Sequence, residues 1–569
     1  MGNIIGIDLG TTTSEVAYIK DGQPVIIGNE KYCDGNIMPS VVTIKKDEII
    51  VGKKAKRQML IRPEITVSEV KRLMGTNEKI VINEKEYLPQ QISAIILKEL
   101  KEMAEEKIGK VDEAVITVPA NFNDIQRAAT KEAAQIAGLK VERIINEPTA
   151  AAMYYGLENI GKEAKILVYD LGGGTFDCTV LELFSGIMDV KASRGDNLLG
   201  GKDFDNRIEE YILEYISKNT EVNIKKLSKK KKSEIKETAE EAKKDLSVSN
   251  STDIIINNLG IDKEGESIDI EFELSRDKFN NLTKDLIERT EVIVGETLLA
   301  SGITGKDIDI VLLVGGSSRM VAVSDMLKKS FGDKIISSVN ADEAVALGAA
   351  VQAGIKDSKI SSESGLIVTD VCSYTLGVAV EENEFSPIIK RDMKLPVIKS
   401  EIYVTSSDDQ ERVNIRVYQG EEKLTDDNMF VGNFVIDGIP KKKAGEEKVE
   451  VTFEYDLNGM LDVSVEVLST GHKKHKLMAV ERLNEKDIKD LSKDINIKQK
   501  NLTWKDSELY NIVSVSISVA KDKFDRMDSK TLENVNSIIS EMKTAIENED
   551  KDKVTKLDDT LTDILFDID

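Results

Sequence analysis

Three hydrophobic patterns follow one another along the chain, and each predicts a different kind of domain. Up to about residue 360, apolar runs such as Asn3–Leu9, 114–118 and 165–170 are each followed by a segment in which we expect a helix, at 15–19, 125–137 and 179–183. Alternating strands and helices are typical of layered α/β domains. The first pattern therefore predicts an α/β domain over residues 1–360.

A change of composition ends this pattern. The residues around 358–364 are polar and rich in serine, which is a linker composition, and the apolar sequence GLIVTD follows at 365–370. From there to about residue 483, apolar and polar residues alternate, as at Val413, Ile415 and Val417. Strict alternation predicts half-buried strands. We therefore predict an interdomain linker over 361–370 and an antiparallel β-sandwich over 371–483.

The third pattern has the period of a helix. Two apolar stripes advance in steps of three and four residues, at Leu532, Val535, Ile539, Met542 and Ile546, and at Val554, Leu557, Leu561, Ile564 and Ile568. They predict a helical hairpin, and we assign residues 484–569 to a C-terminal helical domain. Upstream, Val513, Val515, Ile517 and Val519 alternate as in a strand, so that segment is compatible with either structure.

Composition and charge exclude several classes of protein. With 102 acidic and 78 basic residues, the chain of 569 residues carries a net charge of −24, so we expect no general binding of nucleic acid or anionic membrane. No apolar run of eighteen residues and no signal peptide are recognisable. The three cysteines lie far apart, which favours a reducing cytoplasm. We expect His472 and His475 to lie in a solvated turn, and the lysine run 229–232 to form a solvated helix face.

Three apolar strands run into turns rich in glycine or hydroxyl residues: IIGIDLGTTTS at 4–14, KILVYDLGGGTFD at 165–177 and DIVLLVGGSSR at 309–319. Glycine lets backbone N–H groups approach a phosphate closely, and threonine hydroxyls add donors. Asp8 and Asp170 end the first two strands, and a carboxylate beside a phosphate requires a cation such as Mg²⁺ between them. The turns therefore predict two similar lobes that hold one nucleotide. Neither the P-loop nor the dinucleotide-binding motif follows these strands.

These turns, together with VPANFNDIQRAAT (118–130), RIINEPTAAAMYYG (143–156), LLGGKDFD (198–205) and NADEAVALGAA (340–350), resemble the seventy-kilodalton heat-shock chaperones of the DnaK family. DVCSYTLGV (370–378), VYQGE (417–421) and YDLNGMLDVS (455–464) extend the resemblance over nearly the whole chain, and DVCSYTLG and FSPII look most like the HscC-type branch. The resemblance implies an actin-like α/β ATPase domain, an antiparallel β-sandwich that binds substrate, and a C-terminal α-helical lid.

The resemblance also implies roles for single residues. Asp8, Asp170 and Asp177 would orient Mg²⁺ and its waters, Lys71 would face the γ-phosphate and the attacking water, and Glu147 would hold the water network. For Lys71 the alternative is a surface lysine in a salt bridge. ATP or ADP would be the nucleotide, with K⁺ as a further candidate ion. The implied nucleotide contacts are Gly10, Thr11, Thr12, Gly172, Gly173, Gly174, Thr175, Gly200, Gly201, Glu240, Lys243, Lys244, Ser247, Gly315, Gly316, Arg319 and Asp342.

In the β domain, the resemblance implies a cleft for extended peptides, although plain sandwich core is an equally good account of each residue. The implied cleft residues are Val378, Val380, Ile402, Tyr403, Val413 and Ile415. Glu381 and Ser406 stand where family members have apolar residues arching over the peptide. The implied allosteric residues are Pro119, Arg127, Arg143, Asn146, Thr149 and Asp370.

The sequence thus predicts a cytoplasmic, monomeric chaperone that binds unfolded polypeptides in cycles of ATP binding and hydrolysis. A J-domain co-chaperone and a nucleotide-exchange factor would be its partners. Two alternatives share the actin-like fold: a sugar or acetate kinase, and an actin-like filament protein. Neither would account for the roughly 200 residues that follow residue 360.

Overall fold

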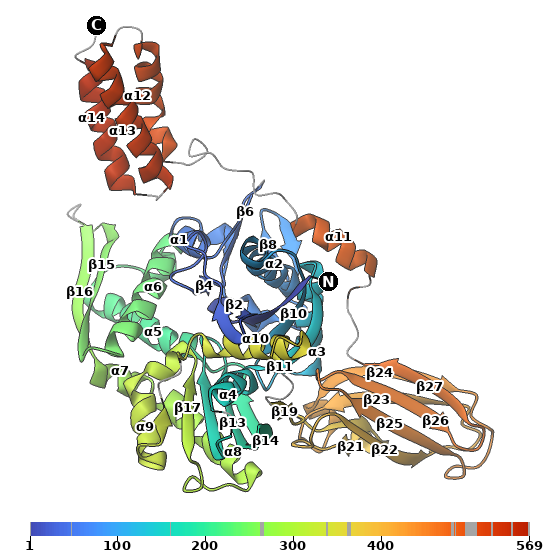
Figure 1. The fold of residues 1–569 in the computed structure, drawn as a ribbon. Helices are drawn as coiled ribbons and strands as arrows, with labels where there is room; N and C mark the ends of the chain where they lie inside the picture. Colours follow the sequence, from blue (N-terminus) through green and yellow to red (C-terminus); the bar gives the residue numbers. More distant parts are fainter. Residues whose placement is uncertain are drawn as a thin grey trace. The chain divides into compact units, whose positions relative to one another are not determined.

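The computed structural model describes residues 2–46, 48–159, 161–261, 267–336, 340–360, 366–478, 483, 485–495, 509–524, 527–547 and 550–566. The chain forms two compact units, residues 1–496 and 497–569, which are described separately below (Figure 1).

A six-stranded sheet organises the first lobe, which we define as residues 3–146, and its strand order is β11-β10-β1-β2-β3 with β4 beside β2. The segment 15–19, which we predicted to be helical, lies in strand β2, antiparallel to β1. Both faces of β2 are largely buried, so its sequence shows no strand-like alternation. The strands are β1 (Asn3–Leu9), β2 (Thr13–Lys20), β3 (Gln23–Ile26), β4 (Met38–Pro39), β10 (Val111–Val118) and β11 (Lys140–Asn146).

A second sheet, in the order β18-β17-β12-β13-β14-β19, organises the second lobe, residues 164–336. The predicted helix at 179–183 is wrong for the same reason, because these residues belong to the buried strand β13, antiparallel to β12. The edge strand β19 comes from the predicted linker and pairs in parallel with β14. The strands are β12 (Ala164–Leu171), β13 (Phe176–Phe184), β14 (Ile187–Asp196), β17 (Ile310–Val314), β18 (Ile335–Ile336) and β19 (Ile367–Thr369).

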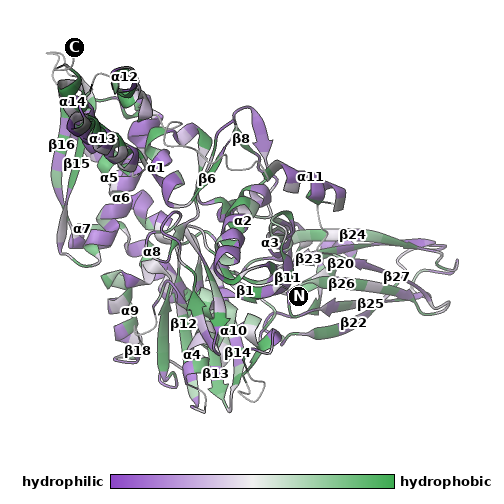
Figure 2. Cartoon of the chain, turned by 45° about the horizontal axis from the view of Figure 1, so that its top comes forward, coloured by the Kyte–Doolittle hydropathy of each residue, from purple (hydrophilic) through white to green (hydrophobic). Residues whose placement is uncertain are grey.

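Helices α4 and α10 pack between the two sheets in one apolar core. They cross closely because residue 348 is glycine: a Cβ there would lie 1.7 Å from the carbonyl oxygen of Ala150. Figure 2 shows hydrophobic residues on the central strands and mainly hydrophilic ones on peripheral helices such as α11. The helices of this region are α1 (Lys53–Ile61), α2 (Pro89–Ile108), α3 (Asp124–Ile136), α4 (Glu147–Glu158), α5 (Gly201–Asn219), α6 (Lys229–Leu246), α7 (Arg276–Leu282), α8 (Lys284–Ser301), α9 (Val321–Phe331) and α10 (Ala344–Lys356).

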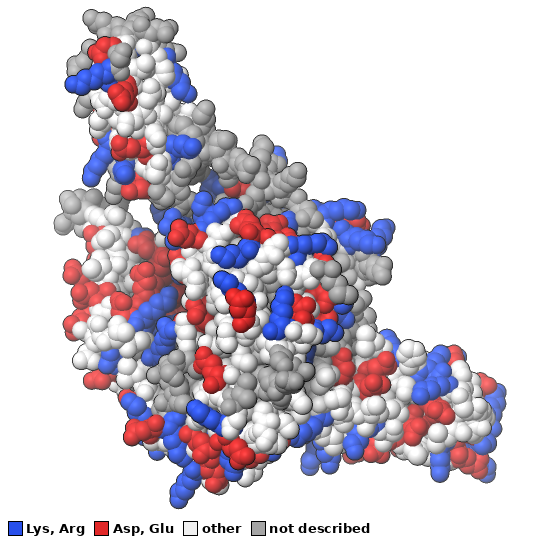
Figure 3. All heavy atoms as spheres, viewed as in Figure 1, with Lys and Arg blue, Asp and Glu red and all other residues white. Residues whose placement is uncertain are grey.

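Smaller strands decorate both lobes. Strands β5 to β7 form a three-stranded sheet, and β8–β9 and β15–β16 form hairpins. The β15–β16 hairpin turns acidic residues such as Glu271 and Glu273 to solvent, and red side chains cluster over it in Figure 3. The bounds are β5 (Val42–Ile44), β6 (Ile49–Val51), β7 (Thr66–Val67), β8 (Ile80–Ile82), β9 (Lys85–Tyr87), β15 (Ser251–Ile261) and β16 (Ser267–Ser275).

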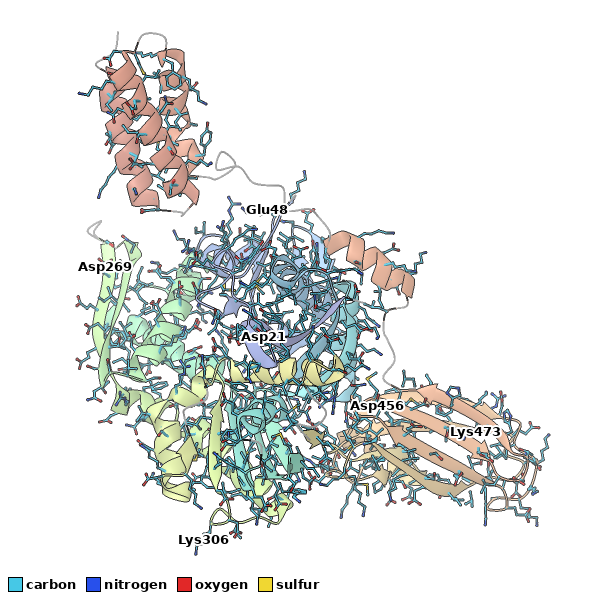
Figure 4. All side chains as sticks on the ribbon, viewed as in Figure 1. Asp21, Glu48, Asp269, Lys306, Asp456 and Lys473 are labelled. Atoms are coloured by element: carbon cyan, nitrogen blue, oxygen red, sulfur yellow. The ribbon has the colours of Figure 1, made fainter. Side chains whose placement is uncertain are left out.

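The β-rich region contains two four-stranded antiparallel sheets around one core, in the orders β21-β20-β23-β24 and β22-β25-β26-β27. Asp456, labelled in Figure 4, begins the tight turn from β25 to β26. His472 and His475 lie exposed in strand β27 and not in a turn. The strands are β20 (Leu376–Ala379), β21 (Phe385–Ile389), β22 (Val397–Val404), β23 (Arg412–Gln419), β24 (Met429–Asp437), β25 (Lys448–Tyr455), β26 (Leu461–Val467) and β27 (His472–Leu477).

Helix α11 (Glu485–Ile495) packs on α2 and α3, where Lys98 Nζ donates to the Ile495 carbonyl over 3.3 Å. The second unit contains α12 (Tyr510–Asp522), α13 (Ser529–Glu547) and α14 (Lys551–Phe566). The ambiguous segment 513–519 is helical, because Val513, Ile517 and Ala520 enter this unit's core at helical spacing. Ile568 lies outside the described residues. Within the described chain, we find no helix with the length and apolar character that a membrane crossing requires.

Candidate functional site

The three glycine-rich turns meet at one pocket between the two lobes. The β1–β2 and β12–β13 turns face each other, and the turn after β17 closes a third side. A Cβ on Gly173 would lie 1.8 Å from Thr12 Oγ1, and one on Gly174 would lie 2.6 Å from Thr11 Cγ2, so only glycine fits where the loops approach. The pocket is lined by Asp8, Gly10, Thr11, Thr12, Thr13, Lys71, Glu147, Asp170, Gly172, Gly173, Thr175, Val314, Gly315, Gly316, Ala341, Asp342 and Val345.

Lys71 approaches this pocket from a short 3-10 helix, Val70–Leu73, and Glu147 approaches it from the first residue of α4. The Lys71 ammonium donates to the Glu147 carboxylate, and both side chains are buried. Burial raises the pKa of Glu147 to about 7, against the opposing effect of Lys71. The alternative that Lys71 is a surface lysine does not hold, because its side chain is only 5% exposed.

Carboxylates outnumber cations around Lys71. Asp8 accepts a hydrogen bond from Thr117 Oγ1 over 2.8 Å, and burial raises the pKa of Asp8 and that of Asp170. Together with Glu147 and Asp177, they make four acids around one lysine among the described residues, of which Asp170, Asp177 and Glu147 are buried and Asp8 is partly buried. A divalent cation would supply the missing positive charge, and Mg²⁺ suits such a site because it keeps several of its waters. The residues present therefore fit Mg²⁺.

Asp177 does not line the pocket, although the sequence suggested a role beside Mg²⁺. Its carboxylate crosses to the first lobe and accepts hydrogen bonds from Asn121 Nδ2 over 2.8 Å and from the backbone N–H groups of Ala120 and Asn121 over 3.3 Å. Burial raises the pKa of Asp177 to about 6. Asp177 thus ties the second phosphate turn to the residues that follow Pro119.

The remaining expected nucleotide contacts lie on α5, on α6 and in the segments that follow β17. Lys243 is buried, lies 2.7 Å from Asp205 and donates to the Gly201 carbonyl over 3.2 Å. Burial raises the pKa of Glu240, but the cations of Lys244 and Lys56 outweigh it and lower the pKa to about 2. The other expected residues lie nearby: Gly200 and Gly201 at the start of α5, Lys244 and Ser247 at the end of α6, and Arg319 paired with Asp342 over 2.6 Å.

The expected allosteric residues form a connected network. Arg127 donates to the Ala120 carbonyl over 3.2 Å and to Asn146 Oδ1 over 2.6 Å. Asn146 Nδ2 and Thr149 Oγ1 donate in turn to Asp370 Oδ2, over 2.8 and 3.2 Å. Arg143 does not join this chain of hydrogen bonds, because its guanidinium donates to Gln352.

The β-sandwich contacts the first lobe through several hydrogen bonds that the motifs did not reveal. Tyr455 Oη donates to Asp124 over 2.8 Å, Ser373 Oγ donates to the Ala120 carbonyl over 2.6 Å, and Tyr374 Oη donates to the Asn121 carbonyl over 2.9 Å. Ser373 and Tyr374 stand in the DVCSYTLG segment, which the sequence identified by its resemblance but not as a contact between domains.

The expected peptide-cleft residues separate into two sets. Val378 and Ile415 are buried, and Val380, Tyr403 and Val413 are partly buried against the sandwich core. Ile402 lies on the opposite face of β22 from Tyr403, opposite Glu450, and is 54% exposed. Ile402 therefore does not join the others. Glu381 and Ser406 are both exposed.

Known proteins are similar to this chain over nearly its whole length. The model of the Hsp70 protein family matches residues 4–568. The chain is 42% identical to the chaperone protein DnaK of Thermotoga neapolitana over 98% of this chain and 95% of that protein. It is 45% identical to the chaperone protein DnaK of Ureaplasma parvum serovar 3 over 82% of this chain and 76% of that protein. Since the family match spans the lobes, the sandwich and the C-terminal helices, the chain belongs to the Hsp70 family.

Proposed function

We propose that this protein is an ATP-dependent chaperone that binds extended apolar segments of unfolded polypeptides and changes its affinity for them through ATP binding and hydrolysis. Membership of the Hsp70 family carries the ATPase and chaperone activities. The two lobes around the phosphate pocket suit the actin-like arrangement, with domains at 1–360, 371–483 and 484–569 joined by the linker 361–370. The finer placement in the HscC-type branch stays a prediction.

ATP hydrolysis on this site needs positioning and charge neutralisation more than covalent chemistry. Mg²⁺, when bound with its waters near Asp8 and Asp170, neutralises charge on the phosphates. Lys71 places a cation at the pocket, and Glu147, hydrogen-bonded to it, can hold a water for attack. The N–H groups and hydroxyls of the 10–12 and 172–175 turns bind the phosphate chain.

The observation that supports coupling is a continuous path from the phosphate turn to the linker. It runs from Asp177 to Ala120 and Asn121, then through Arg127 and Asn146 to Asp370. Residues 367–369 of the linker form β19, and Leu366 is buried against the core between the sheets. A change at the phosphates can therefore bias whether the linker and the sandwich stay bound to the lobes.

The kinase and filament alternatives are not favoured, because the family match continues through the sandwich to residue 568. A J-domain co-chaperone, an exchange factor, a monomeric state, a cytoplasmic location and a K⁺ ion beside the nucleotide remain proposals. The cleft formed by Val378, Val380, Tyr403, Val413 and Ile415 would take the peptide.

The linker offers the sharpest test of the proposed cycle. Leu366 is 7% exposed whereas Ile367 is 58% exposed, so the two neighbours form a matched pair. Leu366→Asp should abolish ATP-driven release of a bound fluorescent peptide while leaving nucleotide affinity within about threefold, because a buried charge opposes linker binding. Ile367→Asp should release the peptide as the wild type does. Normal ATP-driven release in the Leu366 variant would contradict coupling through the linker.

A further inference from the structure

The carbonyl groups of the second phosphate turn are all held on the side away from the pocket. Gly201 N donates to the Gly172 carbonyl and Lys202 N donates to the Gly173 carbonyl, each over 2.9 Å. The third carbonyl, that of Gly174, accepts from Arg72, with Nη2 at 2.9 Å and Nε at 3.2 Å. Two donors therefore come from the start of α5, whereas the third comes from a side chain of the first lobe.

Peptide planarity makes these carbonyl contacts important for the opposite side of the loop. The carbonyl of one residue and the N–H of the next belong to one rigid plane and point in opposite directions. Fixing the Gly174 carbonyl therefore fixes the direction of the Thr175 N–H. Within the described chain, the N–H groups of Gly173, Gly174 and Thr175 have no protein acceptor, as an anion-binding loop requires.

Arg72 is itself held by a second contact. Its Nη2 donates to Asp203 Oδ2 over 2.5 Å, and Asp203 Oδ2 also accepts from Gly200 N over 2.8 Å. One guanidinium thus bridges the phosphate turn and the start of α5. Glu69, three residues before Arg72 in the first lobe, lies 3.2 Å from Lys202, which adds a second ion pair between this first-lobe segment and the start of α5. Lysine could not replace Arg72, because a point-like ammonium lacks the planar fork that serves both acceptors.

We propose that Arg72 is a positioning residue for ATP hydrolysis, which aims the Thr175 N–H at the phosphate chain by holding the Gly174 carbonyl when the first lobe closes on the second. This inference rests on the proposed ATPase function. Lys71 and Arg72 are consecutive, so closure that brings Lys71 to the pocket brings Arg72 to the turn. The same closure of the lobes therefore orients the Thr175 N–H and brings Lys71 to the pocket.

The test compares Arg72→Ala and Arg72→Lys with Arg207→Ala, whose exposed guanidinium pairs with Asp285 outside the pocket. Single-turnover hydrolysis of bound ATP should fall about 10- to 100-fold in both Arg72 variants. Removing one hydrogen-bond donor to a transition state typically slows the reaction about 10²- to 10³-fold, and a misdirected donor should cost part of that. ATP affinity should change less than about fivefold, because binding is shared among many donors. Arg207→Ala should hydrolyse ATP at the wild-type rate.

A structural role alone would give a different pattern. Loss of ATP affinity and of thermal stability in proportion to the loss of rate would overturn the proposal, as would wild-type hydrolysis in Arg72→Ala. Recovery of the full rate by Arg72→Lys would also contradict it, because charge and not the fork would then suffice. Failure of the wild-type protein to hydrolyse ATP at all would instead reject the ATPase function, so the two failures are distinguishable.

Discussion

Lys71 is the residue on which the charge balance of the phosphate pocket depends. Its ammonium lies near buried or partly buried carboxylates from three different strands and one helix start, and it donates to Glu147. Removing one partner of a buried ion pair usually costs several kcal/mol, because the other charge is left without compensation. With one lysine among several carboxylates, the carboxylates stay incompletely compensated unless a divalent cation also enters the pocket.

Lys71→Ala should abolish ATP turnover and leave ATP affinity within about tenfold of the wild type, because the phosphates keep the backbone donors of both turns. Single-turnover hydrolysis and equilibrium binding of a fluorescent ATP analogue measure the two quantities. Arg207→Ala, which removes an ion pair to Asp285 outside the pocket, is a control expected to stay within about threefold. Unchanged hydrolysis in Lys71→Ala would contradict the assigned role.

Most of the single residues that line the phosphate pocket could be predicted from the sequence, because their positions follow from local structure. Asp8 and Asp170 end apolar strands before glycine turns, and a strand end fixes where a side chain lies. The direction of Asp177 depends on the hairpin register and on a loop 56 residues away in sequence, which no local pattern carries. The role of Arg72 likewise depends on two lobes meeting.

Among the secondary-structure elements, strands β2 and β13 were wrongly predicted to be helices from their hydrophobic pattern. Each is buried on both faces, so it lacks the alternation that identified the sandwich strands. The sandwich strands were predictable because one face packs on the core and the other meets solvent. The same rule separates Tyr403 from Ile402 on β22.

Tyr403→Ala should weaken binding of an extended apolar peptide by about 10-fold or more, since an aromatic contact at a pocket is lost. Ile402→Ala should leave affinity within about twofold, because Ile402 points away from the shared core. Fluorescence anisotropy with a labelled peptide in ADP measures both. Equal losses in the two variants would place the peptide on the outer face of β22.

For the whole molecule, the contact between the sandwich and the lobes cannot be derived from local sequence. It depends on Asp124, which is buried between α3 and the sandwich and accepts from Tyr455 and Gln419. Arg194 and Asp392 add a two-bond ion pair from the second lobe, at 2.7 and 2.6 Å. A sequence motif cannot predict such pairs, because the two partners lie far apart in the sequence and in different domains.

Burial raises the pKa of Asp124 to about 6, against the opposing effects of Tyr455, Arg127 and Gln419, while Asp456 adds repulsion. Since the pKa is raised in the contact, protonation favours the contact, and this contribution is lost as pH rises through about 6. The contact, followed in the presence of ATP by energy transfer between dyes on the first lobe and the sandwich, should strengthen roughly fourfold from about pH 7.5 to about pH 5.5. Asp124→Asn should reduce this dependence, and an unchanged profile would contradict it.

Residues 497–569 fold as their own unit, with Val513, Val535, Met542, Val554 and Leu561 in its core. Removing them should leave basal ATPase within about twofold, because the residues that line the phosphate pocket, from Asp8 to Val345, all belong to the first unit. If they form a lid, peptide should leave the ADP state faster, as stopped-flow fluorescence would measure. An unchanged release rate would reject the lid role for this unit.

Gly459 is a position at which one substitution could weaken the contact between the β-sandwich and the first lobe. Its φ is +72°, which an asparagine tolerates, but a Cβ there would lie 2.9 Å from Cδ of Arg127. The sandwich and the first lobe therefore leave no room for a side chain at position 459 unless Arg127 moves. Asparagine at 459 should displace the Arg127 side chain and, through its 3.2 Å approach to the Tyr455 hydroxyl, weaken the contact between the two domains. A chaperone with weakened coupling between these domains would then need only one codon change.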